Sequence, residues 1–336
     1  MREKILSIIA CPACRGDFRI ESAQRQGDHI TSGTLVCTAC SSSFPIEASV
    51  PRLLVGKEHK DTRDHFTKQW ELRRSGRAAV ETEKQGTIYG AKHDVYLEWV
   101  GQECLGGVEP GGWMVDAGCG SGEKTAWFAQ RYPEANLVGF DLNDTLAEAA
   151  AAARGVPNID FVQGDVTHPP FKKRSLNRLH SFGVLHHTPD TKRAFDQVSE
   201  LVAEGGRCMI WIYPHGEESE ILQFFYTIRD SHFLGLGHKI PPRALLWAVR
   251  GYLLAAAPWL LAQNLKFRKI EWPAYWDFRE QPLPEYMNTL VFMLYDNLTP
   301  EFQHRHRRAE VRDWLWSAGF TAVTNDEYGH YWATRG

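Results

Sequence analysis

The chain has 336 residues, of which 43% are hydrophobic, and its formal net charge is −3. This length is enough for about two domains with buried cores. The balanced charge argues against binding of nucleic acid over a broad basic surface, because such binding depends on many cations that neutralise phosphates. We therefore expect a globular protein, which can still carry a local basic patch.

The N-terminal segment lacks the pattern of a secretory signal. Only six consecutive apolar or small residues lie between Lys4 and Cys11, and the apolar core of a signal peptide is longer. We expect a cytoplasmic protein without a transmembrane segment.

Four cysteines form two CxxC pairs, Cys11 with Cys14 and Cys37 with Cys40, separated by 22 residues. In a reducing compartment this spacing predicts a metal site and not a disulfide framework. Four thiolates complete the tetrahedral shell of Zn²⁺, so the ion would be structural, with no open position for catalysis. A redox CxxC is a weaker interpretation, because no thioredoxin-like βαβ pattern surrounds the pairs.

The residues around these cysteines resemble a known module. The segments ILSIIACPAC, LVCTAC and SFPIEASVPRLL are similar to the zinc-ribbon module that activates several tRNA and translation-factor methyltransferases, over about residues 3–55. The usual glycine before the isoleucine-proline turn is Ser49 here. The resemblance implies a zinc ribbon over residues 1–56, but the module also occurs fused to other methyltransferases and so does not identify the substrate.

Residues 57–112 are interpreted as a linker and N-terminal helices. The spacing predicts one helix over Asp64–Arg74 and another over Asp94–Leu105. Phe66 and Trp70 lie four residues apart and, with Tyr89, could close over a ligand of the next domain. Packing against the zinc ribbon is an equally good interpretation.

The next segment, WMVDAGCGSG, is an apolar run that leads into Gly118, Gly120 and Gly122. Glycine permits positive φ and a close approach to a ligand. The pattern therefore predicts a nucleotide-cofactor loop, the alternative being an ordinary tight turn between a strand and a helix.

The residues after these glycines favour the cofactor loop. The segment 123–132 has helical spacing of apolar residues, and 136–141 is typical of a buried strand that ends on Asp141. Asp141 follows Gly118 by 23 residues. At that spacing a carboxylate can accept hydrogen bonds from two ribose hydroxyls.

Further alternating segments extend the α/β pattern. Gly205 and Gly206 are expected to end the second of two helices. The predicted helices are 144–154 and 190–202, and the predicted strands are 159–162, 176–184 and 208–213.

Four motifs in this region resemble the ordered motifs of class I S-adenosylmethionine-dependent methyltransferases: VDAGCGSG, GFDLN, FVQGDV and FGVLHHTPD. The likeness covers residues 113–213 and resumes near the C-terminus. It implies a doubly wound, Rossmann-like, mostly parallel seven-stranded sheet that binds S-adenosylmethionine.

The resemblance also implies roles for individual residues. Gly118, Gly120 and Gly122 would border the methionine half of the cofactor, and Asp116 would hold the loop or reach the cofactor amine through water. Asp141 would bind the ribose, and Leu142 would contact the adenine. Asp165 would accept from the adenine amine, the Val166 amide would meet a ring nitrogen, and Phe182 would lie beneath the methyl group.

Two histidines are the candidate catalytic residues. His186 and His187 directly follow the predicted fourth strand, and an imidazole titrates near neutrality. A general base is needed only for a weakly acidic acceptor such as a hydroxyl. Tyr213 and His215 are weaker candidates, and at least one of the two histidines is expected only to orient the following turn.

Residues 214–303 are interpreted as an insertion that forms a helical lid and most of the acceptor pocket, and 304–336 as the helix and strands that complete the core. Within the insertion, Trp247, Tyr275, Trp276 and Tyr295 could line that pocket.

The apolar stretch 243–265 predicts a buried lid helix or a homodimer contact, with a shallow membrane-surface helix as the alternative. Pro258 is expected to break it. The basic cluster His304–Arg308 predicts a solvated first turn before the last helix, or else a phosphate site.

Three classes of function follow from these patterns. The favoured one is a methyltransferase that acts on a small metabolite, sugar or natural product. The alternative is an RNA or protein methyltransferase that uses the ribbon for docking. A noncatalytic cofactor-binding partner fits least, because the glycines and acidic motifs are intact.

Overall fold

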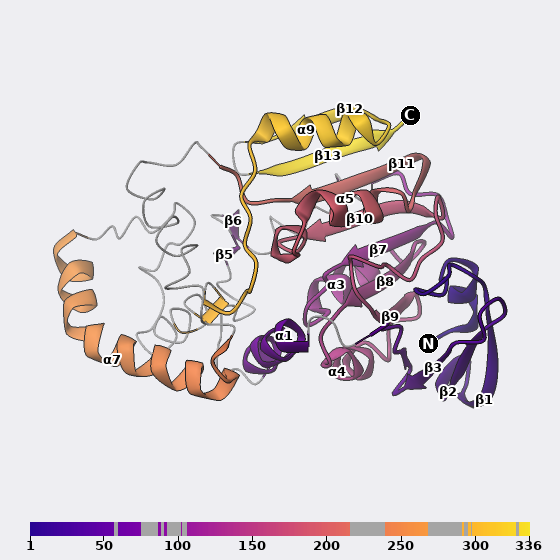
Figure 1. Ribbon diagram of the computed structural model, residues 1–336, viewed down its shortest axis with the longest axis horizontal. Coiled ribbons are helices and arrows are strands. Elements are labelled where there is room, and N and C mark those ends of the chain that lie inside the picture. Colours follow the sequence, from indigo (N-terminus) through magenta and orange to yellow (C-terminus); the bar gives the residue numbers. More distant parts are fainter. Residues whose placement is uncertain are drawn as a thin grey trace. The chain divides into compact units, whose positions relative to one another are not determined.

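The computed structural model divides the chain into two compact units (Figure 1). The first contains Met1–Lys60, Gly101–Phe224 and Phe302–Gly336, and the second contains Asp61–Val100 and Phe225–Glu301. The structure describes residues 1–56, 60–74, 87–88, 91–92, 102, 106–215, 239–267, 291, 295–296, 298–326 and 329–336. Tyr89, Tyr275, Trp276 and all of the predicted helix 94–105 except Gln102 lie outside the described residues. The domain boundaries and the lid stay predictions.

The first unit is built on a seven-stranded sheet with the order β12-β13-β11-β10-β7-β8-β9. Strands β7 to β11 run parallel to one another, and β13 is antiparallel to both β11 and β12. The strands are β7 (Trp113–Ala117), β8 (Asn136–Asp141), β9 (Ile159–Gln163), β10 (Leu176–Phe182), β11 (Val202–Trp211), β12 (Phe320–Asn325) and β13 (His330–Arg335). This confirms the predicted α/β fold with a mostly parallel seven-stranded sheet.

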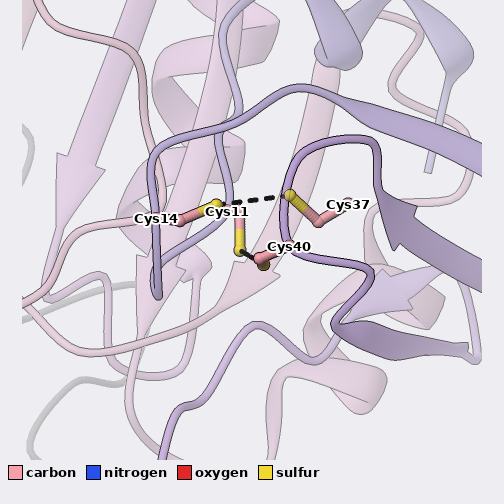
Figure 2. Close-up of side chains that lie close together, drawn as sticks. All are labelled: Cys11, Cys14, Cys37 and Cys40. Carbon is pink, nitrogen blue, oxygen red and sulfur yellow. Dashed lines mark hydrogen bonds between the residues drawn. The ribbon is translucent and has the colours of Figure 1, made fainter.

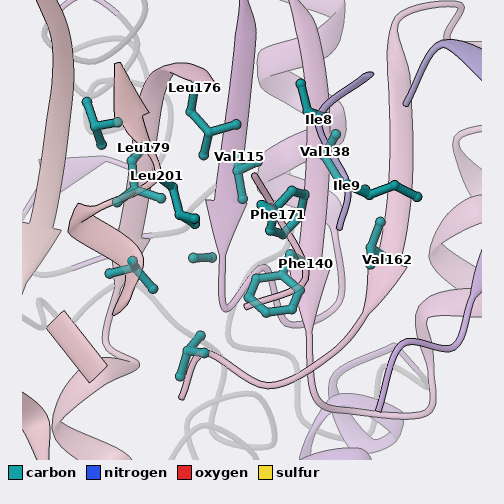
Figure 3. Packing of buried hydrophobic residues seen from close by; sticks show 14 of the residues in the cluster. Ile8, Ile9, Val115, Val138, Phe140, Val162, Phe171, Leu176, Leu179 and Leu201 are labelled. Carbon is teal, nitrogen blue, oxygen red and sulfur yellow. The ribbon is translucent and has the colours of Figure 1, made fainter. Parts of the chain in front are cut away.

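Helices accompany the sheet as the alternating pattern predicted. They are α3 (Glu123–Arg131), α4 (Leu146–Ala152), α5 (Thr191–Ser199) and α9 (Arg308–Ser317). The Asp190 side chain caps α5 by accepting the Arg193 N–H at 2.9 Å. The central strands are mostly buried, and Val115, Val138 and Leu179 are fully buried around Phe171 (Figure 3). Burial of this kind is expected of parallel strands covered on both faces.

One helix boundary was wrong. The segment 190–202 was predicted as a helix stopped by Gly205 and Gly206, but α5 ends at Ser199 and both glycines lie inside β11. Gly205 has φ +70°, and the pairing of β11 with β10 is irregular there. The glycines therefore serve a bulge in a strand, where a positive φ is also needed.

The N-terminal residues form an antiparallel sheet of four strands in the order β1-β2-β3-β4. The hairpin between β1 and β2 turns through Gly27, whose φ is +62°. A short 3₁₀ helix, η1 (Glu3–Ser7), precedes strands β1 (Phe18–Gln26), β2 (His29–Cys37), β3 (Ser43–Glu47) and β4 (Val50–Pro51).

This small sheet packs on the β9 edge of the large one. Arg52 pairs in parallel with Gln163, and the Leu53 N–H donates to the Gln163 carbonyl at 2.8 Å. The buried Arg2 guanidinium donates two hydrogen bonds to Asp160 Oδ2, from Nε at 3.1 Å and from Nη2 at 2.8 Å. The two sheets therefore share one hydrophobic core.

The second unit contains α1 (Lys60–Arg74), α7 (Pro242–Phe267) and the two-stranded ribbon of β5 (Thr87–Ile88) and β6 (Ala91–Lys92). Buried polar side chains of α1 contact the segment near Tyr295: Gln69 Nε2 donates to Asp296 Oδ1 at 2.6 Å, and His65 Nδ1 lies 3.4 Å from the Tyr295 hydroxyl. Among the described helices, none combines the length and apolar character needed to cross a membrane.

Two expectations for this unit were wrong. Pro258 lies inside α7, which continues through it. Trp247 is 71% exposed whereas Tyr295 is fully buried, so these two side chains do not line a common pocket.

Candidate functional site

The four predicted cysteine ligands lie together at one end of the small sheet (Figure 2). Their sulfur atoms all lie within 4.8 Å of one another. The Sγ atoms of Cys11 and Cys40 are 3.7 Å apart, and those of Cys14 and Cys37 are 3.4 Å apart. Tetrahedral Zn²⁺ with Zn–S bonds of about 2.3 Å needs sulfurs about 3.8 Å apart. The donor set and its spacing therefore fit a structural zinc ion.

Two matching turns present these thiols. The Arg15 N–H donates to the Cys11 carbonyl at 2.7 Å, and the Ser41 N–H donates to the Cys37 carbonyl at 3.1 Å. Arg15 and Ser41 both have positive φ, 67° and 61°. Between the turns, a Cβ on Gly16 would lie 2.9 Å from the Cys37 sulfur. The sequence predicted the four ligands, and their proximity confirms the cluster.

The second site lies at the carboxyl ends of the parallel strands. The chain order reverses between β7 and β10, and ligands of open α/β sheets bind at such a point. The loop that follows β7 has positive φ at Gly118, Gly120 and Gly122, with values of 86°, 59° and 78°.

Two of these glycines are also required by the packing of the protein itself. A Cβ on Gly118 would lie 2.0 Å from Val184 Cγ2, and one on Gly122 would lie 2.6 Å from a ring carbon of Phe161. Real side chains do not approach so closely. The tight turn kept as the alternative for this pattern therefore applies as well, because the fold itself needs Gly118 and Gly122.

Asp141 ends β8, and its carboxylate orients this loop. Oδ2 accepts the Gly120 N–H at 2.8 Å, and Oδ1 accepts both the backbone N–H and the side-chain amide of Asn143 at 3.0 and 2.8 Å. Burial raises the pKa of Asp141, and these hydrogen bonds oppose that rise. A carboxylate has about four acceptor positions, so the three bonds fix its direction and leave capacity for a further donor.

Asp165 follows the neighbouring strand, β9, at the same edge of the sheet. The Gly164 N–H donates to the Asp141 carbonyl at 2.9 Å and so holds the two strand ends together. Asp165 Oδ1 accepts both the N–H and the hydroxyl of Thr167, at 2.7 and 2.8 Å. Leu142 is half-buried and Val166 is buried. The predicted ribose and adenine residues are thus brought to one edge.

Asp116 points into the protein and not toward the loop surface. Its Oδ2 accepts the Thr125 hydroxyl at 2.6 Å, and its Oδ1 lies 2.7 Å from His180 Nδ1. Burial alone would raise the pKa of Asp116, but the charge and hydrogen bond of His180 hold it below its usual value. The carboxylate therefore joins β7, α3 and β10.

His180 is a residue that the sequence analysis missed. It is 1% exposed in strand β10 and stacks on Phe182. A histidine at a buried strand position is itself a signal, because a buried polar group needs a partner. Phe182 in turn stacks on Trp211, with ring centroids 4.4 Å apart.

The two candidate histidines lie in η2 (Leu185–His187), directly after β10. His186 is fully buried and stacks on Tyr213, with ring centroids 3.8 Å apart. Burial lowers the pKa of His186 well below its usual value, so the ring is neutral. The Tyr213 N–H donates to Nδ1 at 3.4 Å, which assigns the proton to Nε2.

His187 has the opposite arrangement and is only partly buried. Its Nδ1 lies 3.0 Å from the Phe302 carbonyl, and a carbonyl can only accept. The proton of the neutral ring is therefore on Nδ1 and the lone pair is on Nε2. Of the two rings, His187 has the tautomer that can take a proton at Nε2.

The basic cluster His304–Arg308 is not the solvated first turn of a helix, as was expected. The helix α9 begins at Arg308, and the preceding residues run beside the end of β11. The His304 N–H donates to the His186 carbonyl at 2.9 Å, and the His306 N–H donates to the Tyr213 carbonyl at 3.0 Å. This segment therefore positions the turn that carries both candidate histidines.

Comparison with protein families matches two parts of the chain. Residues 115–210 match the family described as a methyltransferase domain, and residues 2–48 match the family described as Trm112p-like protein. These matches confirm both resemblances for the residues they cover.

Curated relatives match part of this chain. Trans-aconitate 2-methyltransferase of Deinococcus radiodurans is 38% identical over 93 residues, which are 28% of this chain and 34% of the relative. The 2-phytyl-1,4-naphtoquinone methyltransferase of Thermosynechococcus vestitus is 28% identical over 116 residues, 34% of this chain and 52% of the relative. The chain thus spans about a third of the length of the first relatives it matches.

Solved methyltransferase structures align with this chain at low sequence identity. Magnesium protoporphyrin IX methyltransferase from Synechocystis PCC 6803 aligns with 14% identity and a TM-score of 0.44, covering 83% of this chain and all of that one. Human N-acetylserotonin methyltransferase aligns with 16% identity and a TM-score of 0.43, covering 84% of this chain and 60% of that one.

Proposed function

We propose that this chain, which joins a Trm112p-like domain to a methyltransferase domain, transfers a methyl group from S-adenosylmethionine to a small-molecule acceptor. The observation that carries the proposal is the pair Asp141 and Asp165. They follow the neighbouring strands β8 and β9, on one side of the positive-φ glycine loop, and that loop follows β7 where the sheet order reverses. A nucleoside has hydrogen-bond donors on its ribose and, for adenosine, on its base.

The chain offers a separate group for each part of this cofactor. Asp141 would accept from the ribose hydroxyls, because its carboxylate is held at the loop and keeps acceptor capacity. Asp165 would accept the adenine amine, with Leu142 and the Val166 backbone beside the ring. The loop through Gly118, Gly120 and Gly122 would border the methionine part, and Asp116 would hold the loop from beneath.

Bound S-adenosylmethionine would supply an already activated methyl group, so the protein would act mainly by alignment and by exclusion of water. His187 would accept the proton of a hydroxyl or amine acceptor at Nε2, since Nδ1 is occupied by the Phe302 carbonyl. His186 would support this turn as a neutral, buried ring. Phe182 would form the floor next to Trp211.

A small-molecule acceptor is favoured over RNA or protein by two observations. The relatives named above are called methyltransferases of trans-aconitate and of a naphthoquinone, both small molecules. In addition, one face of the ribbon packs on the methyltransferase domain of the same chain, through Arg2, Arg52 and Leu53. That contact gives the ribbon an internal role that needs no macromolecular substrate.

Calorimetry with S-adenosylmethionine and S-adenosylhomocysteine tests the cofactor site. We expect Asp141→Asn to weaken both affinities roughly tenfold or more, because a hydrogen bond to a charged group is worth about 1.5–3 kcal/mol. Glu148→Gln, an exposed carboxylate on the adjacent helix α4, is the matched control and should bind like the wild type. Absence of binding heat from the zinc-loaded wild type would refute the proposal.

Tritium transfer from labelled S-adenosylmethionine into a fractionated lysate tests the acceptor. We expect label in the small-metabolite fraction, and roughly a hundredfold less with His187→Gln if a proton must be removed, since general base catalysis contributes about 10²–10⁴-fold. Cofactor affinity of that variant should stay unchanged. Label in RNA or protein would instead support the alternative acceptors.

A further inference from the structure

Helix α7 has one buried face and one exposed apolar face. Leu245, Leu246, Val249 and Leu253 are buried in a cluster with Val291 and Tyr295. On the other side, Trp247, Tyr252 and Leu254 are 71%, 66% and 71% exposed. Large apolar side chains this exposed on one helix are unusual for a surface that faces only water.

The exposed residues form a continuous stripe. At 3.6 residues per turn, the arc from Leu254 through Trp247 to Tyr252 spans roughly 160° of the helix. Among the positions of α7 whose side chains the structure describes, the other exposed ones inside this arc are small or apolar, namely Ala244, Ala248, Gly251, Ala255 and Pro258. We call this stripe the α7 apolar face.

The charges that α7 itself carries are all positive. The 26 residues of α7 contain no Asp or Glu. Arg243 and Arg250 lie at one border of the apolar face, next to Leu254 on the helical repeat, and Lys239 precedes the helix. The Arg250 guanidinium lies 5.8 Å from the centre of the Trp247 ring.

We propose that the α7 apolar face docks on the surface of a lipid bilayer that contains anionic lipids. Trp and Tyr are suited to the bilayer interface, and border cations attract anionic headgroups while their stems cover apolar surface. The helix is not apolar enough to cross a membrane, so it would lie parallel to the surface. A second copy of the same face offers no carboxylate to pair with Arg243 and Arg250, which favours lipid over self-association.

Vesicle co-sedimentation of the full-length, zinc-loaded protein tests this proposal. We expect binding to vesicles of phosphatidylcholine with phosphatidylglycerol, little binding to phosphatidylcholine alone, and weaker binding at high salt because salt screens the attraction. The combined variant Trp247→Ser, Tyr252→Ser and Leu254→Ser should bind roughly tenfold more weakly. Charge reversal by Arg243→Glu with Arg250→Glu should weaken vesicle binding by at least about the same factor.

The matched control is Trp316→Ser. Trp316 is 51% exposed on α9 and also has an arginine, Arg312, over its ring at 5.8 Å. This variant should bind vesicles like the wild type. All altered side chains are exposed or at the border of the face, so thermal unfolding should stay near that of the wild type.

Three results would overturn the proposal: a wild type that does not sediment with anionic vesicles, α7 variants that sediment like the wild type, or an equal loss with Trp316→Ser. Light scattering provides a fourth test. If the wild type is a dimer and the α7 variants are monomers that still bind vesicles, the face is an interface between copies and not a lipid contact.

Discussion

At the scale of single residues, the candidate site is supported by buried polar groups that satisfy one another. Asp116, Thr125 and His180 join two strands and a helix under the glycine loop. A buried carboxylate is costly unless it is hydrogen-bonded or paired, so each member of this set requires the others. The site is therefore oriented by residues that need not touch the cofactor.

His186 makes protein stability depend on pH. Burial holds its pKa in the folded protein below the usual 6.5, so below about pH 6.5 the unfolded chain binds the proton more readily than the folded one. The free energy of unfolding should fall as the pH falls through this range, by at most about 1.4 kcal/mol per pH unit from this group. We expect the free energy of unfolding of His186→Gln to decrease less steeply as the pH is lowered.

Urea unfolding at about pH 7.5 and about pH 5.5 measures this effect, with zinc content verified at both values. The quantity compared is the slope of the free energy of unfolding against pH in the wild type and in His186→Gln, since other groups titrate equally in both proteins. Identical slopes for the wild type and the variant would show that His186 is not the group responsible.

At the scale of elements, the zinc ribbon covers an edge strand of the large sheet. β9 ends the large sheet, and an open edge exposes N–H and C=O groups that can pair with other chains. The residues after β4 cover this edge at Gln163, while Arg2 and Ile9 contact Asp160 and Phe171. The ribbon is therefore packed as part of the first unit's fold.

The buried pair of Arg2 and Asp160 should carry much of this packing. Their side chains are 4% and 1% exposed. We expect Arg2→Met or Asp160→Asn to lower the free energy of unfolding by roughly 3–5 kcal/mol, because either change leaves a buried group without its partner. Urea denaturation measures the change.

The exposed pair of Arg19 and Glu21 on β1 is the control. Their side chains are 54% and 47% exposed, and such surface pairs contribute about 0–1 kcal/mol. Arg19→Gln should therefore be nearly neutral. An equally small effect at Arg2 would mean that the ribbon is held by its apolar contacts alone.

At the scale of the whole molecule, the cysteine cluster is coupled to the methyltransferase domain through shared core packing. Removing the metal should unfold the ribbon, because structural zinc supplies folding free energy. The β9 edge would then lose the Leu53 hydrogen bond to Gln163.

Hydrogen exchange after chelation, with zinc loss verified, measures this coupling. We expect strongly reduced protection in β1 to β4 and a smaller reduction in β9. Strands β12 and β13, at the opposite edge of the sheet, are the internal control and should keep their protection. Full protection of the ribbon without metal would contradict a structural role for zinc.

Much of the first unit could be predicted from periodicity. The segment 136–141 was predicted at the bounds of β8, and the segment 159–162 was predicted to within one residue of β9. Such segments are continuously apolar or amphipathic, and local pattern is enough to assign them. The glycine loop and the four cysteines were recognisable because their chemistry depends on spacing along the chain.

Other features depend on partners far away in the sequence. The use of Gly205 in a bulge follows from its pairing with β10, and the continuation of α7 through Pro258 goes against the local preference. The role of His180 depends on Asp116, which lies 64 residues earlier in the sequence and beside it in the fold. The segment 304–306 was assigned to solvent because its neighbours at Tyr213 and His186 are distant in the chain.

The sequence by itself determined the order of strands and helices, the zinc ligands and the acidic residues at the strand ends, because each follows from local periodicity or short spacing. Only the tertiary structure decided which histidine has a lone pair at Nε2, how Asp116 is held, and which face of α7 is exposed. Burial and hydrogen bonding between distant segments set these properties, and no local pattern encodes them.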